Sequence, residues 1–247
     1  MRILKDNQRN SITMDFIVKS SAPHNHRTHA LIVPVFSVTR LSDAVKSLDA
    51  AVDGHVSAAL KTGDLKADDN GKILKLYEPG GKANRILLVA CGDAKKLDAK
   101  KFASAMQTAI KDLHQSAATD VAILLPDFAD NTQAYDISRQ VVIAAKEVVY
   151  NFTACKSQQD EPKKPLKKIT LLVANTKQKS AISKAATHGQ AIANGQSLSK
   201  DLANLPGNIC TPTYLADQAR QLKRSVRKIK VSVLEEQDME KLGMGSL

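Results

Sequence analysis

Three histidines, His24, His26 and His29, form the only histidine cluster in the sequence. Three imidazoles at this spacing could bind zinc or nickel. They lie in a polar segment ahead of an apolar run, with no acidic or thiol ligand beside them. We therefore expect a solvated loop here rather than a metal site.

Two glycine-containing segments could form ligand-binding turns. Gly243-Met244-Gly245 could open a G-x-G-x-x-G dinucleotide motif, but it follows a helical pattern instead of a strand, and the third glycine is absent. Cys91-Gly92-Asp93 lies where a predicted strand gives way to a helix, the edge at which α/β folds bind ligands. A glycine that the turn itself requires is the simpler interpretation. The sequence contains no G-x-x-x-x-G-K-[ST], H-E-x-x-H or G-x-S-x-G motif.

The sequence is basic, with 36 Lys and Arg against 25 Asp and Glu and a net charge of +11. Phosphate binding by such side chains would weaken steeply with salt. Solvated faces are the ordinary interpretation, and the absence of tryptophan disfavours base stacking. The positive charge concentrates in two clusters: Lys163, Lys164, Lys167 and Lys168, and then Arg220, Lys223, Arg224, Arg227, Lys228 and Lys230.

Cysteine usage and apolar runs restrict the compartment. The three cysteines, Cys91, Cys155 and Cys210, include no C-x-x-C pair, which excludes a zinc ribbon or a thioredoxin-like site. The first residues lack the apolar region of a secretory leader, and no apolar run approaches the ~18 residues of a membrane span. We expect a cytoplasmic protein that does not engage membranes.

Strand and helix patterns alternate through the first two thirds of the chain. Helical periodicity runs through 41–60, with a break at Asp53-Gly54, and from Phe102 to Leu113 and Ile137 to Phe152. Pro79-Gly80-Gly81 predicts a close pair of strands. This order predicts an α/β domain with a mixed, largely parallel sheet flanked by helices. The predicted strands are 15–19, 30–36, 73–77, 85–91, 121–125 and 169–173.

A different pattern begins near residue 180. Residues 180–205 form a long helix-compatible stretch rich in small side chains. Thr211 and Pro212 then predict a helix start, because threonine caps helices and proline suits the first helical position. A strand at Ile229–Val233 and a helix at 235–242 follow. We interpret this as one complete α/β domain followed by the start of a second α/β domain.

The segment 201–216 reads D-L-A-N-L-P-G-N-I-C-T-P-T-Y-L-A. It strongly resembles the D-L-x-N-x-P-x-N-x-x-T-P-x-x-L-A pattern of the leucyl aminopeptidase (cytosol aminopeptidase) family, bacterial type. Residues 14–20, 85–92, 161–168 and 241–244 also resemble that family, so that the resemblance covers essentially 14–247. Residues 1–13 precede the family's usual start, which makes Met14 as well as Met1 a candidate start.

The resemblance implies four parts: an extension at 1–13, a macro-domain-like α/β domain at 14–179, a linking helix at 180–205, and the truncated beginning of the peptidase domain at 206–247. The family signature N-T-D-A-E-G-R is absent. Its metal-holding Lys, Asp and Glu residues and its bicarbonate-holding Arg would all follow Leu247. No catalytic, metal or cofactor residue can be assigned to this chain, and we expect the chain alone to be inactive.

For the intact enzyme, the resemblance implies hydrolytic removal of N-terminal residues from peptides by two divalent cations, manganese or zinc. It also implies a cytoplasmic homo-hexamer. Some bacterial relatives bind DNA, so a DNA-binding accessory or regulatory protein is the first alternative, and the net charge keeps it open. A stand-alone macro-like module for a nucleotide-type ligand is the second.

Overall fold

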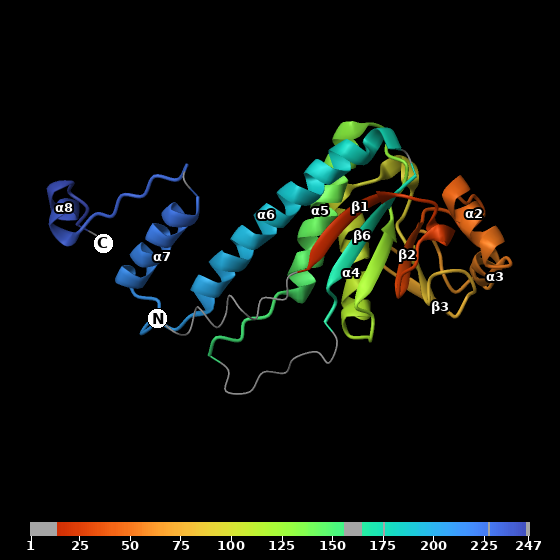
Figure 1. Ribbon diagram of the computed structural model, residues 1–247, viewed down its shortest axis with the longest axis horizontal. Coiled ribbons are helices and arrows are strands. Elements are labelled where there is room, and N and C mark those ends of the chain that lie inside the picture. Colours follow the sequence, from red (N-terminus) through yellow and green to blue (C-terminus); the bar gives the residue numbers. More distant parts are fainter. Residues whose placement is uncertain (1–13, 156–164, 175, 227, 246–247) are drawn as a thin grey trace. The chain divides into compact units, whose positions relative to one another are not determined.

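Four of the six strands are buried along all or nearly all of their length, as strands covered on both faces are. The computed structural model describes residues 14–155, 165–174, 176–226 and 228–245 (Figure 1). Its sheet has the order β1-β6-β5-β2-β4-β3. All neighbouring pairs are parallel except β3–β4, which is the close pair predicted around Pro79-Gly80-Gly81. The strands are β1 (Asp15–Ser20), β2 (Ala30–Val35), β3 (Ile73–Tyr77), β4 (Arg85–Ala90), β5 (Asp120–Leu124) and β6 (Lys168–Val173).

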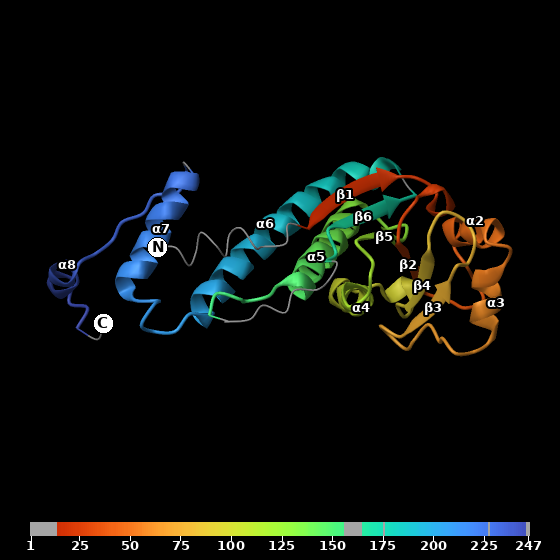
Figure 2. The same cartoon turned by 60° about the horizontal axis from the view of Figure 1, so that its bottom comes forward.

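Successive side chains of each central strand face opposite sides of the sheet. In β2, Ala30 and Ile32 join one buried cluster, while Leu31 and Val33 join the other. The first cluster packs against α4 (Ala99–His114), α5 (Asn131–Val149) and α6 (Lys179–Asn204). The second packs against α2 (Asp43–Ala51) and α3 (His55–Lys61). Figure 2 shows these helices on either side of the strands, so the fold has three layers, as the strand-helix alternation predicts.

Polar residues set the helix starts. Ser42, Asp98 and Asp130 each precede a helix, and each side chain accepts a backbone N–H from the first turn. Such caps satisfy amide groups that have no partner within the helix. The predicted break in 41–60 is present, since Asp53 and Gly54 adopt positive φ between α2 and α3. Short 3-10 turns lie at Pro23–Asn25, Ala94–Lys96 and Thr176–Gln178.

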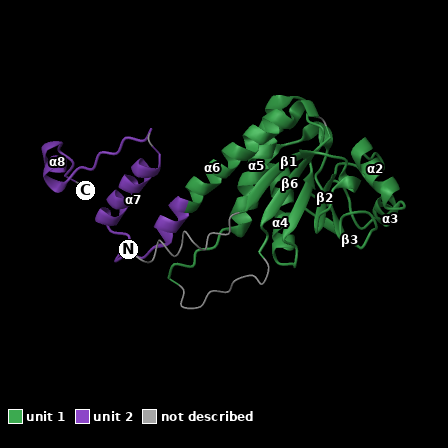
Figure 3. Cartoon of the chain, in the orientation of Figure 1, with its two compact units in different colours: residues 1–197 green, residues 198–247 purple. Residues whose placement is uncertain are grey.

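The long helix α6 crosses the division between two units, residues 1–197 and 198–247 (Figure 3). In the first unit, α6 packs closely against α5 at Gly189, where an added Cβ would lie 2.9 Å from Val142. Both views show these helices side by side (Figures 1 and 2). Glycine allows the close contact because it has no side chain.

The second unit contains α7 (Pro212–Ser225) and α8 (Glu236–Lys241). Thr211 caps α7 and Pro212 opens it, as predicted. The predicted strand at Ile229–Val233 is wrong: the described residues of this stretch are irregular and pair with no strand. An alternating pattern forms a strand only where a neighbour supplies backbone hydrogen bonds. The helix predicted to reach Phe152 ends instead at Val149.

Candidate functional site

The three clustered histidines do not converge. His24 contacts Ser47, with 3.1 Å between its Nδ1 and the hydroxyl oxygen. The Nε2 of His26 is buried and has no hydrogen-bond partner among the described residues. Burial, and then the positive charges of Lys19 and Lys168, lower the pKa of His26, although Asp120 opposes the shift. Among the described residues, no group of three or more His, Cys, Asp or Glu side chains could hold a metal ion.

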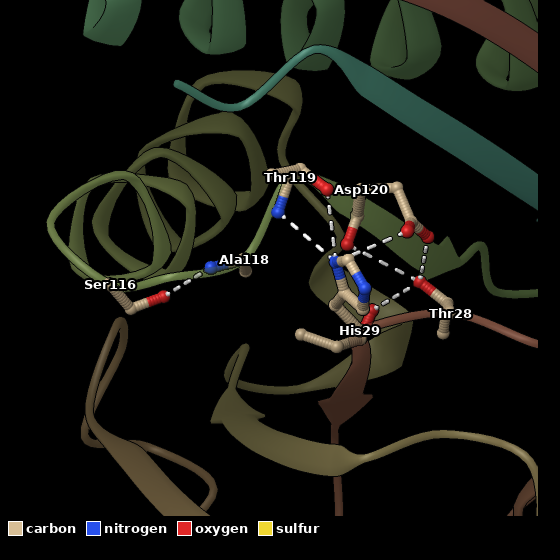
Figure 4. Close-up of polar contacts among 7 residues, drawn as sticks. Thr28, His29, Ser116, Ala118, Thr119 and Asp120 are labelled. Carbon is tan, nitrogen blue, oxygen red and sulfur yellow. Dashed lines mark hydrogen bonds and ion pairs between the residues drawn. The ribbon is translucent and has the colours of Figure 1, made fainter. Parts of the chain in front are cut away.

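His29 instead belongs to a polar cluster at the amino ends of β2 and β5 (Figure 4). Its Nδ1 accepts the N–H of Thr119 at 3.2 Å and lies 3.3 Å from a carboxylate oxygen of Asp120. Ser116 holds the preceding turn by donating to Leu113 O and accepting Ala118 N–H. The sequence shows the histidine but not its partners, which come from 90 residues away.

Thr28 supplies the other half of this cluster. Its hydroxyl lies 2.7 Å from Asp120 Oδ1, and the residue is 2% exposed. A nucleophile–base–acid relay needs the histidine between hydroxyl and carboxylate. Here Asp120 lies between Thr28 and His29, so neither the hydroxyl nor the ring is arranged for nucleophilic catalysis. The cluster connects the segment before β2 to the start of β5.

Replacing Thr28 by valine should lower the free energy of unfolding by about 1.5–3 kcal/mol, because it removes a hydroxyl that donates to a partly buried carboxylate. Urea unfolding followed by circular dichroism measures the change. Thr132→Val is the matched control, since Thr132 is exposed in the first turn of α5. Equal effects of the two substitutions would contradict a stabilising role for the Thr28–Asp120 contact.

The turn at Cys91-Gly92-Asp93 is built by backbone conformation. Gly92 has a φ of 75°, and its N–H donates to Ala67 O. Asp93 caps the following 3-10 turn through Lys95 N–H. Burial raises the pKa of the Cys91 thiol to about 12, so that this cysteine is not a thiolate nucleophile near neutral pH. These contacts support the turn interpretation of Gly92.

Gly243 ends a helix instead of opening a phosphate loop. Its φ is 71°, its N–H donates to Glu240 O, and Met244 N–H donates to Met239 O. This pair of hydrogen bonds is a Schellman motif, the usual way in which a glycine terminates a helix. The dinucleotide interpretation of Gly243-Met244-Gly245 therefore has no support in the local structure.

The structure describes only part of each of the two basic clusters. Lys163, Lys164 and Arg227 lie outside the described residues. On α7, Arg220, Lys223 and Arg224 are exposed, and Arg220 pairs with Asp217 at 2.9 Å. These side chains present positive charge to solvent without forming a shaped site.

The distinctive segment 201–216 folds as the end of α6, a tight turn and the start of α7. Pro206 O accepts two N–H groups, from Ile209 and Cys210. The hydroxyl of Tyr214 is buried with no hydrogen-bond partner among the described residues. Burial, followed by Cys210 and Asp201, raises the pKa of Tyr214. The motif thus encodes the tight turn that connects α6 to α7.

The protein therefore has a three-layer α/β domain, and the long helix α6 leads from it into a second unit. This architecture places the protein in the α/β class. Residues 32–159 match the N-terminal domain of the cytosol aminopeptidase family, and residues 197–247 match the family's catalytic domain. The chain belongs to the cytosol aminopeptidase family.

Individual relatives agree with this assignment. A protein of Nitrosococcus oceani described as a probable cytosol aminopeptidase is 39% identical over 235 residues, and one of Tolumonas auensis is 38% identical over 235 residues. These matches cover 95% and 94% of this chain but 47% of each relative. The chain therefore spans about half the length of the curated relatives it matches.

Solved structures share the fold. A mutant of tomato leucine aminopeptidase aligns with a TM-score of 0.77 at 19% identity, over 95% of this chain and 47% of that one. The bottromycin maturation enzyme BotP in complex with Mn aligns with a TM-score of 0.53 at 17% identity, over 80% of this chain and 36% of that one. At these identities the likeness establishes the architecture alone.

Proposed function

We propose that the intact protein is an aminopeptidase that removes N-terminal residues from peptides. The observation that carries the proposal is the match of 197–247 to the family's catalytic domain, together with the ordered turn that 201–216 forms. The curated relatives described as cytosol aminopeptidases support the same activity.

We also propose that the intact enzyme uses two divalent cations, manganese or zinc. The Mn complex of a structural neighbour supports this choice. The described residues of this chain do not fit such a centre, because no three His, Cys, Asp or Glu side chains among them are grouped to hold an ion. We therefore place the ligands in the half of the relatives' length that this chain does not span, and derive no catalytic step from the residues present.

The test compares two polypeptides, residues 1–247 and a chain extended to the length of its relatives. With added manganese, the extended chain should hydrolyse a leucine anilide, and chelation should abolish that turnover. The 247-residue chain should match a blank that contains only metal. Metal-dependent hydrolysis by residues 1–247 alone would contradict the proposal, and so would an inactive extended chain that is folded and loaded with metal.

The assembly and the location are part of the same proposal. We propose a location in the cytoplasm, which the relatives described as cytosol aminopeptidases support. We also propose a homo-hexamer, and light scattering on the extended chain would measure its mass. No helix of the described residues is long and apolar enough to cross a membrane. DNA binding remains a prediction from the net charge of +11.

A further inference from the structure

A cavity of about 440 Å³ opens at the carboxyl edge of the sheet, within the range of ~300–1,000 Å³ usual for small-molecule sites. Its lining comes from the segments that follow the parallel strands: Phe36 after β2, Leu97 after β4, Phe128 after β5 and Ala174 after β6. The cavity therefore lies within the first unit.

Topology explains why the cavity lies there. After β2 the chain runs to β3 and β4 on one side, whereas after β5 it runs to β6 on the other. The carboxyl ends of β2 and β5 are therefore a switch point, where connections leave in opposite directions and open a crevice.

A proline widens the crevice. Val35 O accepts Cys91 N–H, so position 35 bonds toward β4 and position 34 faces β5. Pro34 has no N–H to offer β5. The pairing of β2 with β5 accordingly ends at Ile32–Ile123, and Pro34 lines the cavity. A proline is rare in a central strand, and here it separates the two strands where a ligand could enter.

Much of the cavity wall is apolar. Phe36 stacks on Phe102 of α4, with ring centroids 6.2 Å apart and planes 9° apart. Phe128 is 6% exposed, and Leu97 and Val45 complete the apolar surface. This wall suits an aliphatic or aromatic side chain.

The polar groups around the cavity carry opposite charges. Lys95 and Asp127 are both exposed, and neither side chain has an ion pair or a hydrogen bond within the described part of the chain. Gln133 accepts Ala129 N–H at its Oε1, which leaves its amide NH2 as a donor. Ser42 accepts Val45 N–H and keeps its own hydroxyl proton to donate. One cation, one anion and two neutral donors therefore border an apolar interior.

We propose that this cavity binds a small zwitterion with an apolar side chain, a free amino acid or a dipeptide. Lys95 pairs with the carboxylate, Asp127 with the ammonium, and Phe36, Leu97 and Phe128 contact the side chain. A polyphosphate is disfavoured because Asp127 repels it. The proposal does not depend on peptidase activity, because every lining residue belongs to the first unit.

The test is isothermal titration calorimetry on the 247-residue chain with L-leucine and with leucyl-leucine. Saturable binding of either compound supports the site. The compound that binds more tightly shows whether the site prefers a free amino acid or a dipeptide. L-leucinamide, which lacks the carboxylate, and N-acetyl-L-leucine, which lacks the ammonium, should each bind about tenfold more weakly.

Substitutions test which residue pairs with the carboxylate of the ligand and which pairs with its ammonium. Lys95→Met should weaken leucine binding about tenfold and remove the preference for leucine over leucinamide. Asp127→Asn should also weaken leucine binding about tenfold, and it should remove the preference for leucine over N-acetyl-leucine. Lys61→Met and Asp68→Asn, at exposed positions outside the lining, are matched controls that should leave affinity unchanged. Circular dichroism checks that each variant folds.

Three results would overturn the proposal. The first is the absence of saturable binding by both leucine and leucyl-leucine. The second is unchanged affinity in folded Lys95→Met and Asp127→Asn. The third is tighter binding of AMP than of leucine, which would assign the cavity to a nucleotide.

Discussion

Replacing Phe102 by alanine should lower the free energy of unfolding of the first unit by about 3–5 kcal/mol. Phe102 is 1% exposed and lies in the larger buried cluster, between α4 and the sheet. Truncation removes the transfer free energy of the ring and leaves a cavity that the rigid neighbours fill only in part. It also removes the stacking contact with Phe36.

Urea unfolding followed by circular dichroism measures this loss. Tyr77→Ala is the control, because Tyr77 is 66% exposed on the edge strand β3, and its loss should be smaller than about 1 kcal/mol. A Phe102→Ala variant no less stable than Tyr77→Ala would show that the α4–sheet interface is not closely packed.

Replacing Gly189 by alanine should destabilise the first unit by about 1–3 kcal/mol. The new Cβ would lie 2.9 Å from Val142 Cβ and 3.0 Å from the carbonyl oxygen of Arg139. A backbone oxygen cannot rotate away as a flexible side chain can, so α5 and α6 must separate. This outcome is opposite to helix propensity, which favours alanine over glycine by about 1 kcal/mol.

Gly195→Ala is the matched control in the same helix. Nothing lies within 4 Å of a Cβ at Gly195, so propensity alone acts and the substitution should stabilise by about 1 kcal/mol. Thermal or urea unfolding of both variants shows whether each substitution raises or lowers the free energy of unfolding. Stabilisation by both substitutions would show that α5 and α6 do not make the close contact at Gly189.

Local patterns determined most of the elements. Leu31, Ile32 and Val33 form a continuous apolar run, which predicts a strand buried on both faces, and β2 is such a strand. Thr211 and Pro212 predict the start of α7 because capping depends on neighbouring residues alone. The family followed from the resemblance of 201–216 to the family's pattern, which is also a run of consecutive residues.

The wrong strand prediction has a physical cause. Ile229–Val233 alternates like a strand, but a strand needs a hydrogen-bonding neighbour, and the alternation contains no information on whether one exists. Pro34, by contrast, lies inside the predicted strand 30–36, and β2 accommodates it because its β5 side is already unpaired there.

The sequence alone thus determined most element types, the α/β class and the family, because these depend on periodicity, caps and contiguous motifs. Only the tertiary structure decided which distant residues meet. It separated His24, His26 and His29 and placed Asp120 between Thr28 and His29. It also brought Lys95 and Asp127 to one cavity. The two residues follow different strands whose carboxyl ends lie at the same edge of the sheet, and their spacing in the sequence does not reveal this.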